Sequence, residues 1–305
     1  MDSLAAAPGT GPATSPLPVL RVSKVAKTLK DLPTDRSLVM GVLNVTPDSF
    51  SDGGRFGSSD EAIAEGLRMH YAGADIIDVG GESTRPNADL TLPDEEQQRI
   101  LPVVKALVKA GALISVDTMH ASTAAKAIDA GAAVVNDVSG LDFDPAMPAL
   151  IAERKVPYVL LHRRGTAATM GSLAQYENVV EEVITEMSRV RDAFVSAGVD
   201  PSLIILDPGL GFAKNEDHNW SILRAINRLN TLGHRVLIGA SRKRFLGTLL
   251  TSAGKAAAPQ ERDHATVAVS ALAAANGAWG VRVHDVGPNL DAVKVSAAWT
   301  DQAPG

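Results

Sequence analysis

The sequence predicts an α/β protein that folds as a single-domain (β/α)8 barrel, the TIM barrel. From Leu38 onward, amphipathic segments end in a triplet with Gly at its centre, and an apolar run rich in β-branched residues follows at once. Gly just past a helix supplies the left-handed conformation that ends it, so each triplet marks a helix end and a strand start. The pattern yields eight strands, and 305 residues is a usual length for this fold in one domain. An open doubly wound sheet is the alternative, and the lack of a Gly-x-Gly-x-x-Gly motif after the first strand disfavours it.

The predicted strands are short and mostly apolar, as strands covered on both faces are. The first carries the run Met40 to Leu43 and then turns abruptly into the polar stretch that ends at Gly54. We place the strands at Leu38–Val45, Asp75–Gly80, Leu113–Asp117, Ala133–Val138, Tyr158–His162, Ile204–Asp207, Val236–Ala240 and Gly280–His284. The triplets that end the helices before them have their glycines at Gly73, Gly111, Gly131, Gly198, Gly233 and Gly277.

The two ends of the chain differ in composition from this repeating part. Residues 1–18 are almost only Ala, Pro, Gly, Ser and Thr, a composition that favours a disordered tail. Residues 19–37 form a lead-in, either a short strand that closes the bottom of the barrel or a solvated segment. The barrel domain is expected over residues 38–299, followed by a short tail at 300–305.

Composition excludes several classes of function. The chain has no cysteine, which rules out disulfides and thiolate chemistry and fits a reducing compartment. Its net charge of −6 gives no overall attraction to nucleic acid or anionic membranes. No run of about 18 apolar residues occurs, and Asp2 stands where a signal peptide carries basic residues. We therefore expect a cytoplasmic protein that holds any anionic substrate with local cations.

Polar side chains follow every predicted strand, and in a barrel all eight strand ends meet at one rim. Asp117, Asn136 and Asp207 end three of the strands. Together they offer adjacent acceptors and donors that suit a flat heterocycle with neighbouring N–H groups, such as the amidine edge of a pterin or guanine.

A second group of strand ends suits phosphate. Arg282 and His284 are two residues apart on one strand and so share a face, and with Ser241 and a nearby helix N-terminus they form a phosphate cradle. Asn44 is a neutral oxygen ligand of the kind that a diphosphate-bound Mg²⁺ accepts. The spacing thus indicates a heterocycle that bears a phosphate or diphosphate.

Ordinary structural roles compete with these assignments. An Asp at a strand end serves equally well as the cap of the next helix, which applies to Asp117 and Asp137 singly. Asn136 can satisfy buried backbone groups, and Arg163-Arg164 can be surface residues. The remaining histidines show no metal-ligand spacing, so a zinc site is not expected.

Two long motifs resemble the signature loops of the dihydropteroate synthases, in the same order. They are Leu43-Asn44-Val45-Thr46-Pro47-Asp48-Ser49-Phe50-Ser51-Asp52-Gly53-Gly54 and Asp78-Val79-Gly80-Gly81-Glu82-Ser83-Thr84-Arg85-Pro86. Later landmarks of that family are matched by Ser115-Val116-Asp117-Thr118, Asn136-Asp137, Asp207-Pro208-Gly209-Leu210-Gly211-Phe212, Ser241-Arg242-Lys243 and Arg282-Val283-His284. The resemblance covers about residues 38–299, and the sequence is similar to the actinobacterial members in particular.

The resemblance implies a folate-pathway transferase. Such enzymes join 6-hydroxymethyl-7,8-dihydropterin diphosphate to p-aminobenzoate with Mg²⁺, release diphosphate, and are inhibited by sulfonamides. It also implies a homodimer formed through helix faces.

The family's functional residues carry over onto matching positions of this chain. The resemblance implies catalytic roles for Asp117, Asp207 and Lys243. It implies a pterin site of Asp117, Asn136, Leu161, Asp207, Gly239 and Lys243. It implies a diphosphate site of Asn44, Thr84, Arg85, Arg282 and His284, with Asn44 as the metal ligand. For p-aminobenzoate and sulfonamides it implies Phe50, Ser83, Thr84, Pro86, Phe212, Ser241 and Lys243.

Two positions depart from the family pattern. Asn87 follows Pro86 where many relatives have Gly, which bears on the mobility of the second loop. Arg163-Arg164 follow His162 where many relatives have Met and a polar residue, which bears on one wall of the site. A fold-retaining paralogue without activity and a pterin-binding methyltransferase are the alternatives. The first lacks the intact first loop found here, and the second lacks the Ser-Thr-Arg-Pro loop paired with Ser241-Arg242-Lys243.

Overall fold

The structure, a computed structural model, describes residues 28–46, 57–82 and 91–300. Within them, eight parallel strands form a closed barrel in the order β1-β2-β3-β4-β5-β6-β7-β8. The ring closes where β1 pairs with β8, with Leu38 opposite Gly280. This closure confirms the (β/α)8 barrel and contradicts the doubly wound alternative, whose sheet would be open.

The observed strands match the predicted ones to within two residues at either end. They are β1 (Leu38–Asn44), β2 (Ile76–Gly80), β3 (Ile114–Asp117), β4 (Val134–Asp137), β5 (Tyr158–Leu161), β6 (Ile204–Asp207), β7 (Arg235–Ile238) and β8 (Gly280–Val283). All six glycines predicted to end helices have positive φ, for example 94° at Gly73 and 103° at Gly131. The helix stops were therefore identified for the right physical reason.

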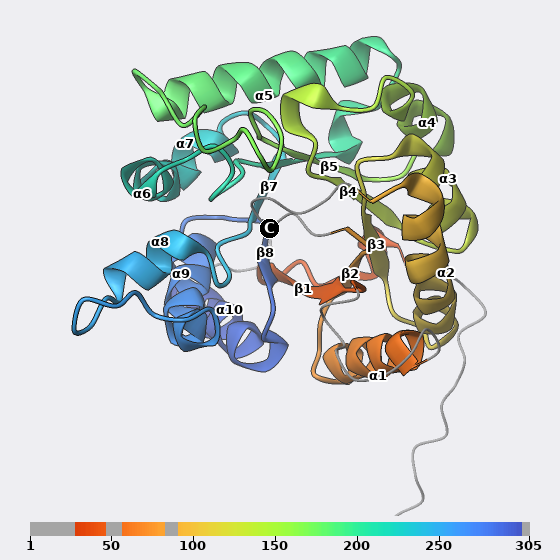
Figure 1. Cartoon of the computed structure of the whole chain (residues 1–305), viewed down its shortest axis with the longest axis horizontal. Helices are drawn as coiled ribbons and strands as arrows, with labels where there is room; N and C mark the ends of the chain where they lie inside the picture. The colour runs from red at the N-terminus through yellow and green to blue at the C-terminus, as the bar shows by residue number, and fades with distance from the viewer. Residues whose placement is uncertain (1–27, 47–56, 83–90, 301–305) are drawn as a thin grey trace, which may run out of the picture.

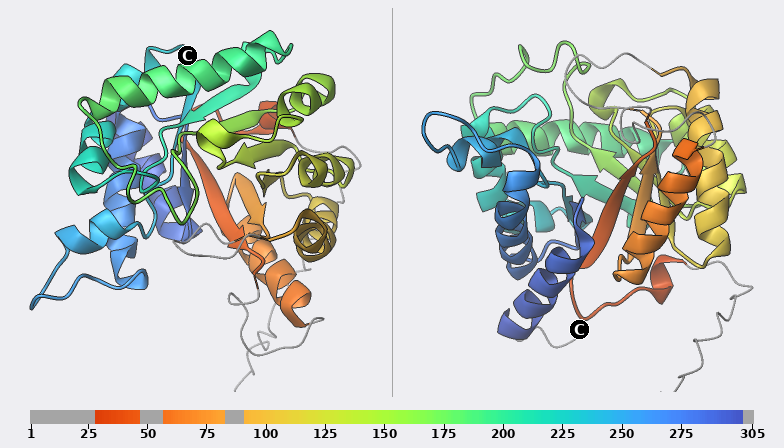
Figure 2. Two further views of the ribbon diagram at one scale, coloured as in Figure 1. Left: turned by 45° about the horizontal axis from the view of Figure 1, so that its top comes forward. Right: turned by 60° about the horizontal axis from the view of Figure 1, so that its bottom comes forward.

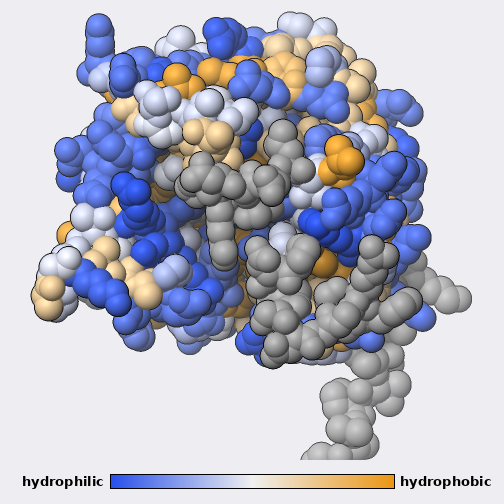
Figure 3. Space-filling view, viewed as in Figure 1, coloured by the Kyte–Doolittle hydropathy of each residue, from blue (hydrophilic) through white to orange (hydrophobic). Residues whose placement is uncertain are grey.

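Helices surround the strands and follow one another around the ring in chain order (Figure 1), and the two views of Figure 2 show the strands enclosed in the same way. They are α1 (Gly57–Tyr71), α2 (Pro93–Lys109), α3 (Ala121–Asp129), α4 (Met147–Arg154), α5 (Val179–Ser196), α6 (Glu216–Arg224), α7 (Ile226–Asn230), α8 (Arg244–Leu249), α9 (Asp263–Ala275) and α10 (Val286–Thr300). On the face shown in Figure 3, most of the described residues are hydrophilic. Among the described residues, no helix is long and apolar enough to cross a membrane.

The core has two parts. A large cluster fills the space between the strands and the helices, and a smaller one fills the bottom of the barrel. The smaller cluster contains Leu38, Met40, Ile76, Leu113, Val134, Val159, Ile205 and Leu237, which identifies the inward-facing positions of seven strands. Below it lies a short 3-10 helix, η1 (Leu29–Asp31). Its first residue, Leu29, and the residue after it, Leu32, pack against this cluster. The described part of the lead-in thus covers the bottom of the barrel without forming a strand.

Candidate active site

Side-chain alternation brings the predicted strand-end residues to the inside of the rim. Successive residues of a strand point to opposite faces, so every second residue after the bottom core also points inward. The predicted site residues with this inward position are Asn44, Asp117, Asn136, Leu161, Asp207, Gly239, Ser241, Arg282 and His284. They come from all strands except β2, whose contribution sequence reasoning missed.

The centre of the site is an arginine shared by two carboxylates. Arg282 Nε donates to Asp78 Oδ2 and its Nη2 donates to Asp117 Oδ2, both over 2.6 Å. Asn136 Nδ2 donates to the same Asp78 oxygen over 2.8 Å. Burial raises the pKa of Asp117 to about 7, and Asp78 adds to this effect while Arg282 opposes it. Burial lowers the pKa of Arg282, but Asp78 and Asp117 outweigh it, so this guanidinium stays charged.

Asp78 is the residue that sequence reasoning missed. It is fully buried on β2, and its Oδ1 has no hydrogen-bond partner. The sequence carried a signal, because a carboxylate interrupts an otherwise apolar strand between Ile77 and Val79. Ser115 Oγ and Asn136 Oδ1 are also buried without partners. Three unsatisfied polar atoms on neighbouring inner strand faces are typical of a site that binds a polar ligand.

Asp207 lies on β6 across the barrel mouth from these residues. Its Oδ1 accepts a hydrogen bond from the backbone N of Gly209 over 2.8 Å, and burial raises its pKa. A Cβ at Gly239 would lie 3.5 Å from Asp207 Oδ2, so the missing side chain leaves space beside this carboxylate. Leu161 and Phe212 belong to an apolar cluster at the same end of the barrel.

Lys243 lies at the end of the loop after β7. Its Nζ is 4.2 Å from the ring centroid of Phe212, a cation–π contact, and it donates no hydrogen bond to a described residue. Burial lowers its pKa to about 8, and Arg282 adds to this effect. A half-buried ammonium with open donors can hold a carbonyl or ring nitrogen of a ligand.

Ser241 and His284 are joined side to side at the ends of β7 and β8. Ser241 Oγ lies 2.9 Å from His284 Nδ1, and it accepts the backbone N–H of His284 over 3.1 Å. Burial and the surrounding cations lower the pKa of His284 to about 3, so the ring is neutral. In the tautomer in which the Ser241 hydroxyl donates to Nδ1, Nε2 carries the proton. His284 offers an N–H group, without positive charge, to an anion at this rim.

Comparison with known proteins identifies the family of this chain. Residues 40–284 match the family model of pterin-binding enzymes. A dihydropteroate synthase from Mycobacterium leprae is 52% identical over 268 residues, which cover 87% of this chain and 94% of that protein. The chain belongs to the dihydropteroate synthase family.

Solved structures of the dihydropteroate synthase family share the fold. The Xanthomonas albilineans dihydropteroate synthase with 4-aminobenzoic acid superposes with a TM-score of 0.81 at 39% identity, covering 89% of this chain and 95% of that one. The same enzyme in complex with 7,8-dihydropteroate gives a TM-score of 0.79 at 38% identity, covering 90% and 97%. The predicted resemblance is therefore confirmed at the level of the family.

A second polar network supports the dihydropteroate synthase site from behind the strands. His162 points outward, and its Nε2 lies 2.8 Å from Glu186 Oε2 on α5. Lys214 Nζ lies 2.8 Å from His162 Nδ1 and donates to the backbone oxygens of Gly209 and Phe212 over 3.1 Å. Burial and Lys214 lower the pKa of His162 to about 4, and burial lowers that of Lys214 to about 7. A neutral imidazole therefore links α5 to the loop that carries Asp207.

The structure contradicts two of the ordinary roles considered for sequence residues, those of Asp137 and of Arg163-Arg164. Asp137 does not cap the next helix; it is buried and accepts hydrogen bonds from Tyr158 Oη and the Ser139 backbone N, both over 2.8 Å. Arg163 and Arg164 are not simple surface residues, because Arg163 is only 6% exposed and Arg164 pairs with Glu182 and Glu186. The partners of Asp137 and Arg164 that reveal these roles, Tyr158 on β5 and the two glutamates on α5, lie on other elements of the fold.

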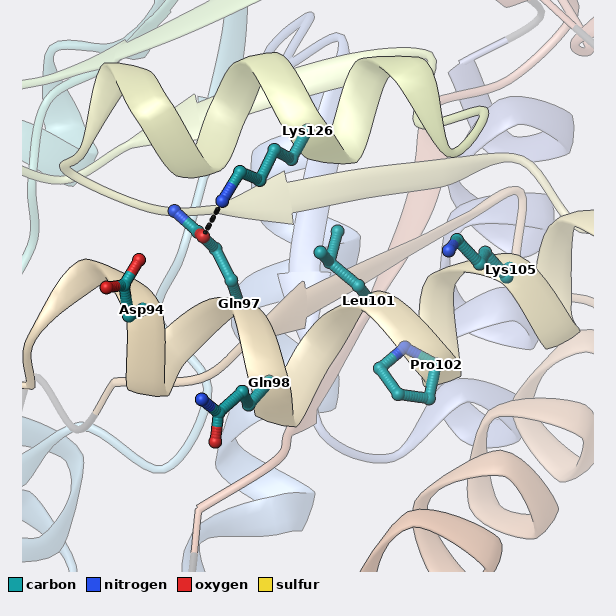
Figure 4. A pocket seen from close by; sticks show the side chains of 7 residues that line it. All are labelled: Asp94, Gln97, Gln98, Leu101, Pro102, Lys105 and Lys126. Atoms are coloured by element: carbon teal, nitrogen blue, oxygen red, sulfur yellow. Dashed lines mark hydrogen bonds between the residues drawn. The ribbon is translucent and has the colours of Figure 1, made fainter.

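Part of the predicted dihydropteroate synthase site lies outside the described residues. These positions are Phe50, Ser83, Thr84, Arg85, Pro86 and Asn87, and their roles stay predictions. A surface groove in the described part lies between α2 and α3, outside the barrel (Figure 4), and it is separate from the rim. Its lining is Asp94, Gln97, Gln98, Leu101, Pro102, Lys105 and Lys126.

Proposed function

We propose that this chain catalyses the reaction of its family and assign its residues to the steps. The reaction condenses 6-hydroxymethyl-7,8-dihydropterin diphosphate with p-aminobenzoate, giving 7,8-dihydropteroate and diphosphate. The observation that carries the assignment is the inward-facing cluster of Arg282, Asp78, Asp117 and Asn136 opposite Asp207. It combines acceptors for a pterin with unsatisfied buried atoms where the ring would lie.

The pterin would lie between β3 and β7. Asp207 accepts from the amino-pyrimidine edge of the ring, where two parallel N–H groups match a carboxylate. The free Asn136 Oδ1 accepts a further N–H, and Lys243 donates to the opposite edge, which carries the carbonyl and a ring nitrogen. Leu161 and the open space at Gly239 receive the flat faces.

The diphosphate and Mg²⁺ would lie over β1 and β8. The Asn44 side chain makes no hydrogen bond to a described residue, and no group of three or more His, Cys, Asp or Glu among those residues forms a metal cluster. This donor set fits Mg²⁺, which keeps several waters and takes most of its remaining ligands from a diphosphate. When bound, Mg²⁺ neutralises the charge of the leaving diphosphate. Arg282 adds positive charge there, and the Nε2–H of His284 adds a hydrogen bond.

The reaction breaks the bond between the pterin methylene and the diphosphate oxygen and forms one to the aniline nitrogen. A dihydropterin can delocalise positive charge from the methylene, so an ionised path is accessible. Asp117, at the end of β3, stabilises that charge when ionised. The aniline nitrogen is neutral and attacks without a strong general base, and the proton that it then loses passes to the released diphosphate or to water. The predicted p-aminobenzoate residues Ser83, Thr84 and Pro86 exclude water from the methylene.

The deciding experiment measures dihydropteroate formation by the purified protein with Mg²⁺, the pterin diphosphate and p-aminobenzoate, omitting each in turn. Product that requires all three supports the transferase. Binding of the pterin diphosphate without product would instead support the fold-retaining paralogue.

We further propose a homodimer and a cytoplasmic location. The dimer would form through α9 and α10, which pack against each other and expose Leu272, Val295 and Trp299, with Trp299 86% exposed. Exposed apolar side chains on adjacent helices are typical of a protein contact. The cytoplasmic location is suggested by the cysteine-free composition.

A further inference from the structure

We propose that Arg163 is a specificity-determining residue that binds the heterocycle of the pterin substrate. The inference rests on the proposed function and adds to it a contact at the position where this chain departs from many relatives.

Arg163 is buried without a partner. It is only 6% exposed, its Nε has no hydrogen-bond partner, and its guanidinium forms no ion pair with a described residue. The other arginines that follow β5 or β7 behave differently, because Arg164 pairs with Glu186 and Arg242 pairs with Asp263. A buried guanidinium without hydrogen-bond partners among the described residues destabilises the protein in the absence of a ligand.

The position of Arg163 directs it toward the heterocycle. Val159 belongs to the bottom core, and Leu161, the last residue of β5, belongs to the apolar cluster at the rim. Arg163 follows two residues beyond the end of the strand and so lies at the mouth of the barrel. The strands on either side carry Asn136 and Asp207, the proposed pterin ligands. The proposed diphosphate residues lie on β1 and β8, on the opposite side of the eight-stranded ring. Arg163 therefore belongs to the pterin side of the mouth.

The backbone of Arg163 is held in place before any ligand binds. Leu141 N donates to Arg163 O over 3.1 Å. A Cβ at Gly140 would come within 2.4 Å of that oxygen, so only Gly allows the loop after β4 to lie so close. A fixed backbone limits the entropy lost when the side chain engages a ligand.

The charges around Arg163 explain why it tolerates burial yet stays available. Burial lowers its pKa, and Asp137, Asp142, Glu82 and Asp117 oppose that effect from the loops of β2, β3 and β4. None of these carboxylates lies within ion-pair distance. The carboxylates maintain the charge of the guanidinium without occupying its N–H groups.

The chemistry of a guanidinium fits a pterin. Its plane stacks on an aromatic face, and its N–H groups donate to a carbonyl or ring nitrogen. The neighbouring Asn136 and Asp207 present mainly acceptors, so Arg163 supplies a donor and a π-stacking surface on this side. A methionine in its place offers apolar contact but no hydrogen bond.

The test compares Arg163→Met and Arg163→Lys with the wild type in the full-length protein. We expect the KM for the pterin diphosphate to rise about tenfold to a hundredfold in Arg163→Met, the range for a lost charged hydrogen bond, with the KM for p-aminobenzoate within about twofold. Arg163→Lys keeps the charge without the planar group and should recover only part of the affinity. Arg154→Met on the surface of α4 removes an exposed arginine and should change neither constant.

Stability distinguishes a ligand contact from a structural role. Since Arg163 has no partner, Arg163→Met should raise the unfolding midpoint of the ligand-free protein while it weakens pterin binding. An unchanged pterin KM, or a lower midpoint with both KM values raised together, would overturn the proposal. Calorimetry with 6-hydroxymethylpterin provides a readout independent of turnover. If the wild type makes no product, weaker binding of this pterin by Arg163→Met still supports the contact, whereas equal binding rejects it.

Discussion

At the scale of single residues, the site is an arrangement of charges that nearly balance before substrate arrives. Asp78 and Asp117 share one guanidinium. Burial keeps the pKa of Asp117 near neutrality, and the charge of Asp78 adds to this effect while Arg282 opposes it. A dihydropterin that brings N–H donors would favour the ionised carboxylate, so substrate binding and ionisation of Asp117 are coupled.

Replacing Asp78 tests this coupling. In Asp78→Asn the like charge that raises the pKa of Asp117 is gone, so that pKa should fall below about 7. The acidic limb of kcat/KM for the pterin diphosphate should move to lower pH, and kcat/KM itself should drop about tenfold or more because Arg282 loses a positioning partner. An acidic limb at the wild-type pH would show that Asp78 does not act on Asp117.

Lys243 is predicted to be essential. Its ammonium lies half-buried beside Phe212 and donates no hydrogen bond to a described residue, so its proposed role is to hold the pterin. Lys243→Ala should abolish turnover, while circular dichroism and the unfolding midpoint stay close to the wild type. Near-normal turnover would remove Lys243 from the site.

The lowered pKa of His162 predicts that the protein loses stability as the pH falls. Its pKa is about 4 when folded and about 6.5 when unfolded, so the unfolded chain binds the proton first as the pH falls. As the pH falls from 7 to 5, protonation of His162 in the unfolded chain should lower the free energy of unfolding by about 2 kcal/mol. Urea unfolding of His162→Gln at both pH values should show a loss smaller by that amount, and an equal loss in both proteins would contradict the assignment.

At the scale of elements, the loop after β6 is fixed from both sides. Lys214 donates to two of its carbonyls and to His162, while Asp207 accepts from its Gly209. The loop after β6, which directly follows the proposed pterin ligand Asp207, therefore depends on β5 and α5 for its shape.

Gly209 is a residue of this loop that lies close to the backbone of His162, the residue after β5. Its φ is 68°, and an added Cβ would lie 1.9 Å from the backbone oxygen of His162. Gly209→Ala should destabilise the protein by about 3 kcal/mol or more, since strain and a backbone clash combine. Gly233→Ala is the matched control, because its φ is 77° and nothing lies within 4 Å of the added carbon. It should cost about 1 kcal/mol. Equal losses by urea unfolding would mean that the close approach does not matter.

The strands and helix ends were predictable because their signals are local. A helix-ending glycine such as Gly73 and the β-branched run after it lie within a few residues of each other. The inner rim residues followed from alternation along each strand, and the motifs supplied their chemistry. Asp78 and Lys214 were missed because their roles depend on distant partners, with Asp78 and Arg282 204 residues apart. The burial of Arg163 likewise requires the barrel, since its sequence neighbours resemble those of a surface arginine.

At the scale of the whole molecule, the proposed dimer depends on one apolar surface. Trp299→Glu places a charge among the exposed apolar residues of α9 and α10. Analytical ultracentrifugation should show the wild type as a dimer and this variant as a monomer. Leu173→Glu changes a 40% exposed leucine in the loop before α5 and should leave the dimer intact. A wild-type monomer, or an unaffected dimer in Trp299→Glu, would contradict the proposal.

The pairing of Arg282 with Asp78 and Asp117 also sets an order of events during synthesis. Arg282 lies on the last strand, 204 residues after Asp78 and 165 residues after Asp117. At about 5–20 residues per second, a ribosome takes roughly 10–40 s to travel from Asp78 to Arg282. During that interval the growing chain carries two acidic groups destined for a buried rim and lacks the cation that neutralises them. A nascent chain that stops before β8 cannot assemble the rim, so affinity for the pterin should arise late in translation and all at once.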